Sequence, residues 1–272
     1  MRSLARGLII VFGYTHPAVV AVALRRGPTA AKRYLQELYR CSRTDLGAHL
    51  PAMTVEQLFA HAASFQVFRP EDSTGTMSTV ESATLCQIVA TLQPKKVVEI
   101  GTFRGVTTLN IALNAPKAVI HTVDLLPNQD PRATVFENAD AEVIRKRGDL
   151  VFQGTPQEKQ IQRYLGDSAI LDFSVIGSGV DLALIDAAHS YEYVRNDTAR
   201  VLPLMAADGI LLWHDYACRD LVEKSHLRWG VSKFLHEIAD VGVVVLKSTS
   251  IGFLRLGKER LDVLRKRLQS PN

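Results

Sequence analysis

The chain has 272 residues, of which 47% are hydrophobic and 22% are charged, as is usual for a folded globular protein. These proportions exclude collagen-like, low-complexity and wholly disordered proteins. The net charge of +4 is uneven: residues 1–40 carry +6 and residues 255–272 carry +4, which leaves −6 for residues 41–254. The long central part therefore lacks the basic face of a nucleic-acid-binding protein, and we expect no nucleic-acid partner.

The N-terminal region contains an apolar run, Leu8–Leu24, with arginines on both sides. The run is shorter than the roughly 20 residues that a membrane-spanning helix needs, and His16-Pro17 interrupts it. The simplest interpretation is a helix that is buried or covered by a partner, and a second copy of the chain as that partner predicts a homodimer. The alternatives are contact with a membrane surface and a secretory signal cleaved after Ala23. The chain has three widely spaced cysteines, Cys41, Cys86 and Cys218, and no C-x-x-C pair. This pattern favours a reducing compartment, and we expect the protein in the cytoplasm.

The pattern of apolar residues divides the chain into three parts. Helices are expected over residues 28–40 and 51–68, followed by a polar loop over 69–78. From there, short β-rich runs alternate with helical patterns, which is typical of a parallel sheet covered on both faces. The expected strands are 97–100, 118–123, 160–165, 181–185 and 209–213, with a closing hairpin of 241–246 and 251–256. The expected helices are 85–92, 106–113, 133–147, 191–205, 231–238 and 261–268.

These elements predict a Rossmann-like, doubly wound α/β fold with a mostly parallel seven-stranded sheet and a closing antiparallel hairpin. The sheet and its helices are expected in one domain, residues 76–256. A helical N-terminal region, residues 1–75, precedes this domain, and a basic C-terminal helix, residues 257–272, follows it.

The most informative segment is V-V-E-I-G-T-F-R-G-V-T-T, residues 97–108, in which a buried strand ends in a glycine turn that opens a helix. Such a turn forms a cradle for a ligand. A dinucleotide fingerprint has glycines at i, i+2 and i+5, but after Gly101 these positions are Phe103 and Val106. A phosphate-binding loop ends in Gly-Lys-Ser/Thr, but here Val106 follows Gly105. The turn therefore disfavours both NAD and ATP.

The remaining pattern, E-x-G-x-x-x-G from Glu99 to Gly105, resembles motif I of the class I S-adenosylmethionine-dependent methyltransferases. The resemblance implies that the glycines let the backbone approach the aminocarboxypropyl arm of S-adenosylmethionine. It also implies that an acidic residue at the end of the second strand binds the two ribose hydroxyls. Asp124 lies there, with a carboxylate that can accept both hydrogen bonds. The cofactor-binding residues implied in this part are Glu99, Gly101, Thr102, Gly105, Thr107 and Asp124.

Two later segments extend the resemblance to about residues 79–256. G-D-S at 166–168 resembles the segment after the third strand of small-molecule O-methyltransferases, in which Asp167 and Ser168 would bracket the adenine. D-A-A-H-S-Y-E at 186–192 resembles the D-x-x-H-S-Y-E segment of a family that contains sugar O-methyltransferases and a cephalosporin-hydroxylase-like branch. The resemblance implies methyl transfer to a hydroxyl of a small molecule, such as a sugar or a secondary metabolite.

Polar residues at the predicted strand ends should line one crevice, because ligands bind beyond the carboxyl ends of parallel strands. Asp186 and Asp215 offer carboxylates to a hard cation such as Mg²⁺, which lowers the pKa of a bound hydroxyl. His214 stands where metal-dependent relatives carry an acid or an amide, and as a third ligand it would favour a borderline metal such as Mn²⁺. The alternative is that no metal binds here. In that case Asp215 forms hydrogen bonds at the end of its strand, and His214 lies in the core or contacts the substrate. We therefore consider Asp186, His214 and Asp215 as metal ligands.

His189 is the expected general base, since the ordinary pKa of imidazole suits proton removal near neutral pH, and Asp186 completes the catalytic pair. The alternative is that His189 only caps the following helix. Two other functions also stay open. A cofactor-binding protein without methyl transfer would fit the unusual His214, and a hydroxylase-like activity is implied by the cephalosporin branch alone.

Overall fold

The computed structural model describes residues 49–69, 75–126, 148–216 and 229–269. Several sequence predictions lie outside these residues: the apolar run 8–24, the helices 28–40 and 133–147, and the cysteines Cys41 and Cys218. Within the described part of the chain, no helix is both long enough and apolar enough to cross a membrane.

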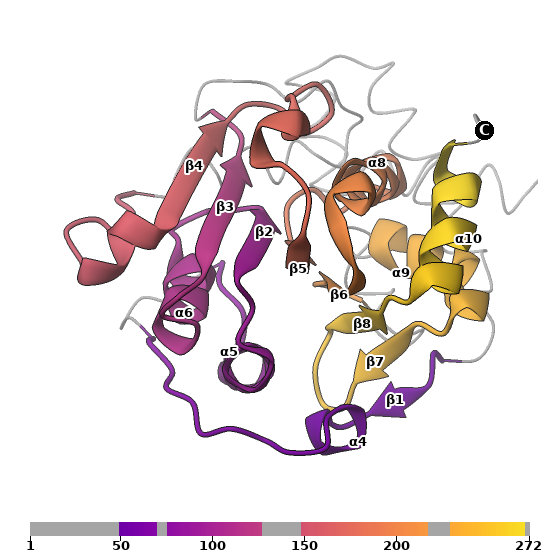
Figure 1. Cartoon of the computed structure of the whole chain (residues 1–272), viewed down its shortest axis with the longest axis horizontal. Coiled ribbons are helices and arrows are strands. Elements are labelled where there is room, and N and C mark those ends of the chain that lie inside the picture. The colour runs from indigo at the N-terminus through magenta and orange to yellow at the C-terminus, as the bar shows by residue number, and fades with distance from the viewer. Residues whose placement is uncertain (1–48, 70–74, 127–147, 217–228, 270–272) are drawn as a thin grey trace, which may run out of the picture.

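The centre of the fold is an eight-stranded sheet with the strand order β1-β7-β8-β6-β5-β2-β3-β4, which Figure 1 shows as a diagonal row. In this described sheet, neighbouring strands are parallel except at β8, which is antiparallel to β6 and β7. The predicted doubly wound α/β fold with its closing hairpin is confirmed. The strands are β1 (Ala52–Met53), β2 (Lys96–Ile100), β3 (Val119–Asp124), β4 (Ile161–Leu165), β5 (Val180–Ile185), β6 (Met205–Trp213), β7 (Val244–Leu246) and β8 (Gly252–Arg255).

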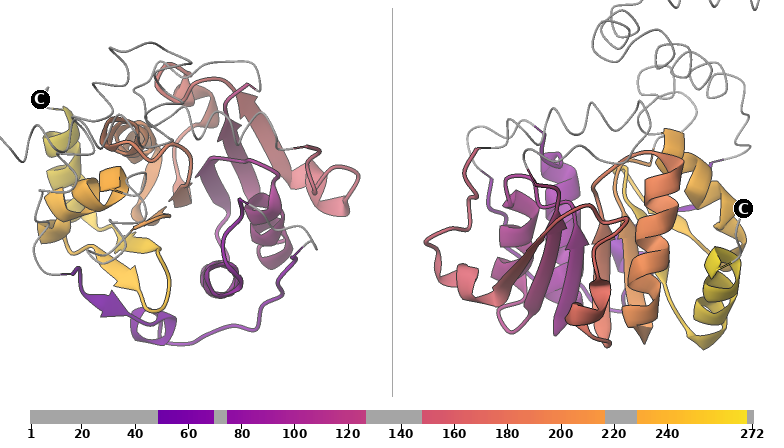
Figure 2. Two further views of the ribbon diagram at one scale, coloured as in Figure 1. Left: turned by 180° about the vertical axis from the view of Figure 1, so that it is seen from behind. Right: turned by 90° about the horizontal axis from the view of Figure 1, so that it is seen from above.

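Helices cover both faces of the sheet (Figures 1 and 2). One face carries α5 (Thr79–Leu92) and α6 (Val106–Asn114), and the other carries α8 (Tyr191–Val201), α9 (Trp229–Glu237) and α10 (Lys258–Gln269). The remaining elements are short: α4 (Val55–Leu58) and the 3-10 turns η1 (Pro156–Gln160), η2 (Phe173–Ile176), η3 (Leu202–Leu204) and η6 (Ala239–Val241).

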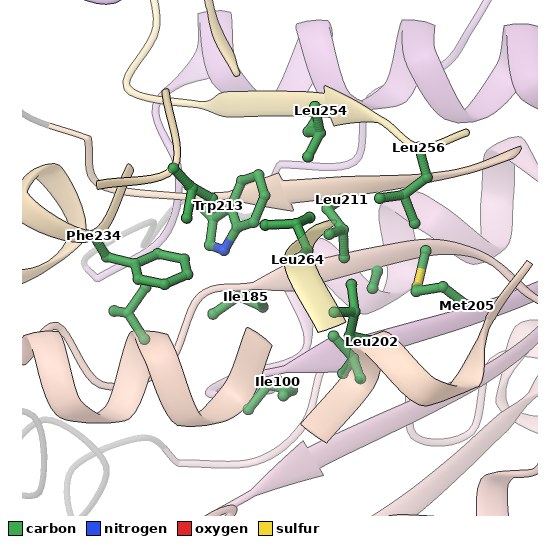
Figure 3. Close-up of a cluster of buried hydrophobic side chains, with 14 of the residues drawn as sticks. Ile100, Ile185, Leu202, Met205, Leu211, Trp213, Phe234, Leu254, Leu256 and Leu264 are labelled. Atoms are coloured by element: carbon green, nitrogen blue, oxygen red, sulfur yellow. The ribbon is translucent and has the colours of Figure 1, made fainter. Parts of the chain in front are cut away.

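Successive side chains of a strand point to opposite faces of the sheet. Because consecutive residues of the central strands are apolar, both faces of the sheet are apolar. In β5, Leu182 and Leu184 pack in the cluster with α5 and α6, whereas Ala183 and Ile185 pack in the cluster with α8, α9 and α10. Figure 3 shows this second cluster, in which Trp213 lies beside Phe234 of α9. The indole N–H of Trp213 is not left unpaired, since it donates to the Thr198 hydroxyl at 2.9 Å.

The prediction of a helix over residues 51–68 is wrong, because only α4 is helical there. The two-residue strand β1 adds to the seven strands that the sequence predicts, and it pairs with β7 in the register Ala52↔Val245. Beyond α4, the backbone binds side chains of α6 instead of forming helical hydrogen bonds. The amide of Phe68 donates to Asn110 Oδ1 at 2.7 Å, for example.

The helix predicted to continue to Met205 also ends earlier, at Val201. Pro203 has no backbone N–H to continue α-helical hydrogen bonding, and the chain makes the turn η3 instead. Met205 then begins β6, four residues before the predicted start of this strand at Gly209.

Candidate active site

A cavity of about 330 Å³ lies at the carboxyl ends of the parallel strands. The strand order reverses between β5 and β2, and an open α/β sheet forms its ligand crevice at such a point. Of the residues predicted to form the site, Glu99 and Gly105 do not line this cavity. Those that line it are Gly101, Thr102, Thr107, Asp124, Asp167, Ser168, Asp186, His189, His214 and Asp215.

The glycine turn needs both of its glycines, but for different reasons. Gly101 has a φ of +106°, and a Cβ on it would lie 2.0 Å from the carbonyl oxygen of Asp186. Gly105 has a φ of +75°, and a Cβ on it would lie 2.4 Å from the ring of Phe152. Gly101 therefore lets β2 and β5 approach each other at the cavity wall, whereas Gly105 permits packing behind the turn.

Glu99 supports the turn from inside the fold. Its Oε2 accepts hydrogen bonds of 2.6 Å from the hydroxyls of Thr108 and Thr122. Burial raises the pKa of Glu99 to about 8, although these two hydrogen bonds oppose the shift. Because the proton of Thr122 is directed to Glu99, the hydroxyl of Thr102, 2.6 Å from that of Thr122, must be the donor of that pair. A chain of hydroxyls thus connects the cavity wall to a buried carboxyl group.

The ends of β3 and β4 bring two further acidic residues to the cavity. Asp124 is 6% exposed, and its backbone carbonyl accepts from the amide of Gly166 at 2.9 Å. Asp167 follows directly and is 2% exposed. Its Oδ1 accepts from the hydroxyl of Tyr193 and from the amide of Ala169, both at 2.9 Å.

Ser168 lines the cavity and forms a hydrogen bond with Asp197 on the buried side of α8. Asp197 is fully buried, and burial raises its pKa to about 7 against the hydrogen bonds from Ser168 and Asn196. The negative charge of Asp167 contributes to the same shift. The side chains of the cavity wall at the end of β4 are therefore polar and buried.

The opposite wall carries the segment D-A-A-H. His189 Nε2 lies 2.6 Å from Asp215 Oδ2, which makes a histidine–carboxylate pair. Ligand atoms of Asp186, His189 and Asp215 all lie within 4.8 Å of one another. The backbone of Asp215 has a φ of +67°, and such a conformation in a residue other than glycine is characteristic of functional sites. The structure thus brings His189 together with both carboxylates of the predicted metal set.

His214 lies between three carboxylates. Its Nδ1 is 3.0 Å from Asp186 and 3.4 Å from Asp215, and its Nε2 is 3.5 Å from Glu81. Burial by itself lowers the pKa of His214, but the three carboxylates outweigh this effect and raise the pKa far above its usual range. His214 thus faces three carboxylates, whereas the compact group of possible metal ligands contains the imidazole of His189 together with Asp186 and Asp215.

Burial also raises the pKa of Asp215, but hydrogen bonds from His189 and His214 outweigh it, so the pKa is lowered overall. Glu81 behaves in the same way: burial is outweighed by hydrogen bonds from His214, Ser250 and Ser78. These carboxylates are therefore ionised near neutral pH.

Sequence reasoning missed Glu81, because α5, which carries it, is far along the chain from β6, which His214 follows. The S-x-x-E capping box of Ser78 and Glu81 is visible in the sequence, but it predicts only a helix start. Glu81 itself does not line the cavity, and the cavity residues that sequence reasoning missed include Gly75, Thr76, Met77, Phe103 and Arg104.

Residues 98–216 match a family model described as a methyltransferase domain. No curated protein matches the chain.

Three solved structures resemble parts of this chain at low sequence identity. A presumed O-methyltransferase from Nostoc punctiforme is 16% identical (TM-score 0.40), over 72% of this chain and 51% of that one, so this chain spans about half its length. A presumed O-methyltransferase from Klebsiella pneumoniae is 15% identical (TM-score 0.46), over 88% and 94%. The O-methyltransferase of tomaymycin synthesis from Streptomyces achromogenes, in complex with S-adenosylmethionine, is 17% identical (TM-score 0.45), over 67% and 82%.

The matched segment begins in β2 and ends directly after β6. It therefore contains the glycine turn, Asp124, the G-D-S segment and the group of Asp186, His189 and Asp215. The resemblance to methyltransferases inferred from the sequence is confirmed, since residues 98–216 match the model of a methyltransferase domain.

Proposed function

We propose that the protein transfers the methyl group of S-adenosylmethionine to a hydroxyl of a small molecule, such as a sugar or a secondary metabolite. The observation that carries this proposal is the histidine–carboxylate pair of His189 and Asp215. The pair lines the same cavity as the glycine turn. A base and a cofactor cradle in one cavity are what methyl transfer to a hydroxyl requires.

Three features of the cavity fit the three parts of the cofactor. Gly101 lines the cavity at the turn where β2 and β5 approach each other, and this turn would hold the aminocarboxypropyl arm. The carboxylate of Asp124 is suited to the two ribose hydroxyls. Asp167 has a buried carboxylate oxygen, Oδ2, with no hydrogen-bond partner among the described residues, and the amino group of adenine would supply one. When bound, S-adenosylmethionine supplies a methyl group on a sulfonium, which is a strong electrophile.

His189 would remove the proton of the acceptor hydroxyl. Asp215 holds one nitrogen of the ring, which fixes the tautomer and stabilises the imidazolium formed when the other nitrogen takes a proton. Methyl transfer is an in-line displacement, so we expect most of the rate acceleration to come from positioning of the acceptor oxygen.

A divalent cation is a second candidate at the same wall, because Asp186, His189 and Asp215 form a compact group of two carboxylates and one imidazole. This donor set suits Mn²⁺, Fe²⁺ or Zn²⁺ better than Mg²⁺. A cation would polarise the acceptor hydroxyl. In that case His189 would be a ligand and could not also be the base.

Calorimetric titration of S-adenosylmethionine and S-adenosylhomocysteine, with and without chelator, tests the proposal. We expect micromolar binding that D124A loses and that D208A retains, because Asp208 is exposed at the start of β6, away from the cavity. Absence of binding to the wild type would overturn the proposed function. Methyl transfer that resists chelator favours His189 as base, whereas transfer that chelator abolishes and Mn²⁺ restores favours the cation.

Binding without product across a broad panel of hydroxyl acceptors would instead favour a cofactor-binding protein without methyl transfer. The hydroxylase-like activity, the homodimer, the cytoplasmic location and the contact of the N-terminal region with a membrane surface stay predictions from the sequence.

A further inference from the structure

One face of α8 holds the loop that follows β4. Tyr193, Asp197 and Arg200 have the spacing i, i+4 and i+7, which places them on the same side of the helix. Tyr193 donates its hydroxyl proton to Asp167 at 2.9 Å, and Asp197 is hydrogen-bonded to Ser168. The guanidinium of Arg200 donates to the carbonyls of residues 169 and 171. Three consecutive turns of this helix therefore fix the loop 166–171.

The two carboxylate oxygens of Asp167 have different surroundings. Oδ1 accepts from both Tyr193 and the amide of Ala169. Oδ2 is buried, and it has no hydrogen-bond partner among the residues that the structure describes. A buried acceptor without a donor is unfavourable, because it has lost its hydrogen bonds with water. Because Asp167 lines the cavity, an N–H group of a ligand there would remove this penalty.

We propose that Tyr193 is a positioning residue that orients Asp167 toward the exocyclic amino group of the adenine. The inference rests on the proposed function, because it requires the cofactor in this cavity. The hydroxyl of Tyr193 occupies Oδ1 and so leaves Oδ2 as the oxygen for the ligand. Without this hydroxyl, the amide of Ala169 would be the one remaining donor to the Asp167 carboxylate in the described part of the chain, and the carboxylate could rotate away. Tyr193 thereby sets the selectivity of the site for a 6-aminopurine over a 6-oxopurine.

The position of Tyr193 supports this role. The side chain is 9% exposed and lines the cavity, so its hydroxyl is not at the protein surface. Its amide donates to the hydroxyl of Ser190, the N-cap of α8, and His189 directly precedes that cap. A single helix start therefore carries both the proposed base and the group that positions Asp167.

Binding of two ligands tests the inference without an acceptor: S-adenosylhomocysteine and S-inosylhomocysteine, in which a 6-oxo group replaces the 6-amino group. We expect the wild type to prefer the adenosyl ligand by about tenfold or more, which corresponds to one hydrogen bond of about 1.4 kcal/mol. Y193F and D167N should bring this ratio close to one. Y191F is the matched control and should keep the wild-type ratio, because Tyr191 donates to Glu237 of α9.

A wild-type ratio in Y193F would overturn the inference. An equal loss of affinity for both ligands would also overturn it, because it would indicate a merely structural tyrosine. Should Y193F fail to fold, D167N decides alone, and a wild-type ratio in D167N contradicts the inference. Failure of the wild type to bind S-adenosylhomocysteine would instead contradict the proposed function, so the two failures are distinguishable.

Discussion

The carbonyl oxygen of Asp186 packs directly over the α-carbon of Gly101, where a Cβ would lie 2.0 Å from it. The amide of Asp186 also donates to the carbonyl of Ile100 at 2.8 Å. The ends of β2 and β5 are thus in contact at the point where the strand order reverses, and one missing side chain permits that contact.

The first prediction concerns this contact. G101A should lose measurable binding of S-adenosylhomocysteine and should destabilise the protein by about 2 kcal/mol or more, because the clash is with backbone and the φ is positive. Calorimetry and thermal unfolding measure both effects. G257A is the control, since a Cβ on Gly257 meets no atom within 4 Å. Binding by G101A within twofold of the wild type would show that this contact is dispensable.

The second prediction separates the two candidate metal ligands. If a cation binds at the group of Asp186, His189 and Asp215, H189N should lose Mn²⁺ binding, whereas H214Q should retain it. The reason is that both nitrogens of His214 face carboxylates. Calorimetric titration with Mn²⁺ makes the measurement. The reverse pattern would restore the set of Asp186, His214 and Asp215 predicted from the sequence, and no binding to the wild type would contradict a metal site.

The third prediction is a dependence of stability on pH that arises from Glu99. Its pKa is about 8 in the folded protein, against 4.5 for the ordinary side chain. Between these values the folded state binds more protons than the unfolded state, so stability falls as pH rises. E99Q keeps an acceptor for Thr108 and Thr122 but cannot ionise. The melting temperature of E99Q relative to the wild type should therefore rise by a few degrees from pH 5 to pH 8.

Thermal unfolding across this range tests the third prediction. E259Q serves as the control, because Glu259 is exposed on α10 and its difference from the wild type should be the same at every pH. A constant difference for E99Q as well would mean that Glu99 is ionised in the folded protein.

The fourth prediction concerns α9, whose first turn packs against the segment of His189. A Cβ on Gly230 would lie 2.2 Å from the carbonyl oxygen of His189 and 2.4 Å from the amide of Tyr191. G230A should displace His189 and lower kcat by about tenfold or more, because small misplacements of reacting groups are costly. The Kd of S-adenosylhomocysteine should change much less.

Steady-state kinetics on an acceptor found by screening, together with calorimetry, tests the fourth prediction. Alanine is the better helix former by about 1 kcal/mol, so a loss in G230A can only come from packing. Unchanged kcat with raised stability would show that the contact with His189 is without consequence.

The ends of the strands could be predicted from the sequence, and the contacts between distant elements could not. Gly101, Asp124 and Asp186 follow short runs of β-branched and aliphatic residues, and a parallel sheet necessarily brings such ends to one edge. Glu81 lies on α5, which is distant from β6 along the chain and comes close to the end of β6 through tertiary folding. Nothing in the local pattern around His214 indicates that a carboxylate faces its second nitrogen.

The prediction of a helix over residues 51–68 was wrong for a similar reason. Its apolar residues have helical spacing, but the amides of Gln66 and Phe68 bind the side chains of Asn114 and Asn110. These asparagines lie more than forty residues further along the chain. A periodic pattern reports which side chains are buried, and it cannot report that a tertiary contact replaces the helical hydrogen bonds.

The pairing of β1 with β7 sets an order of assembly during synthesis. β2, β3 and β4 pair in the order in which they leave the ribosome, so they can associate early. β1 must wait for β7, since Ala52 pairs with Val245 and the amide of Leu50 donates to the hydroxyl of Tyr216. Until then, β1 lacks the strand with which it pairs in the folded protein. Of the eight strands, the one translated first is thereby among the last to join the sheet.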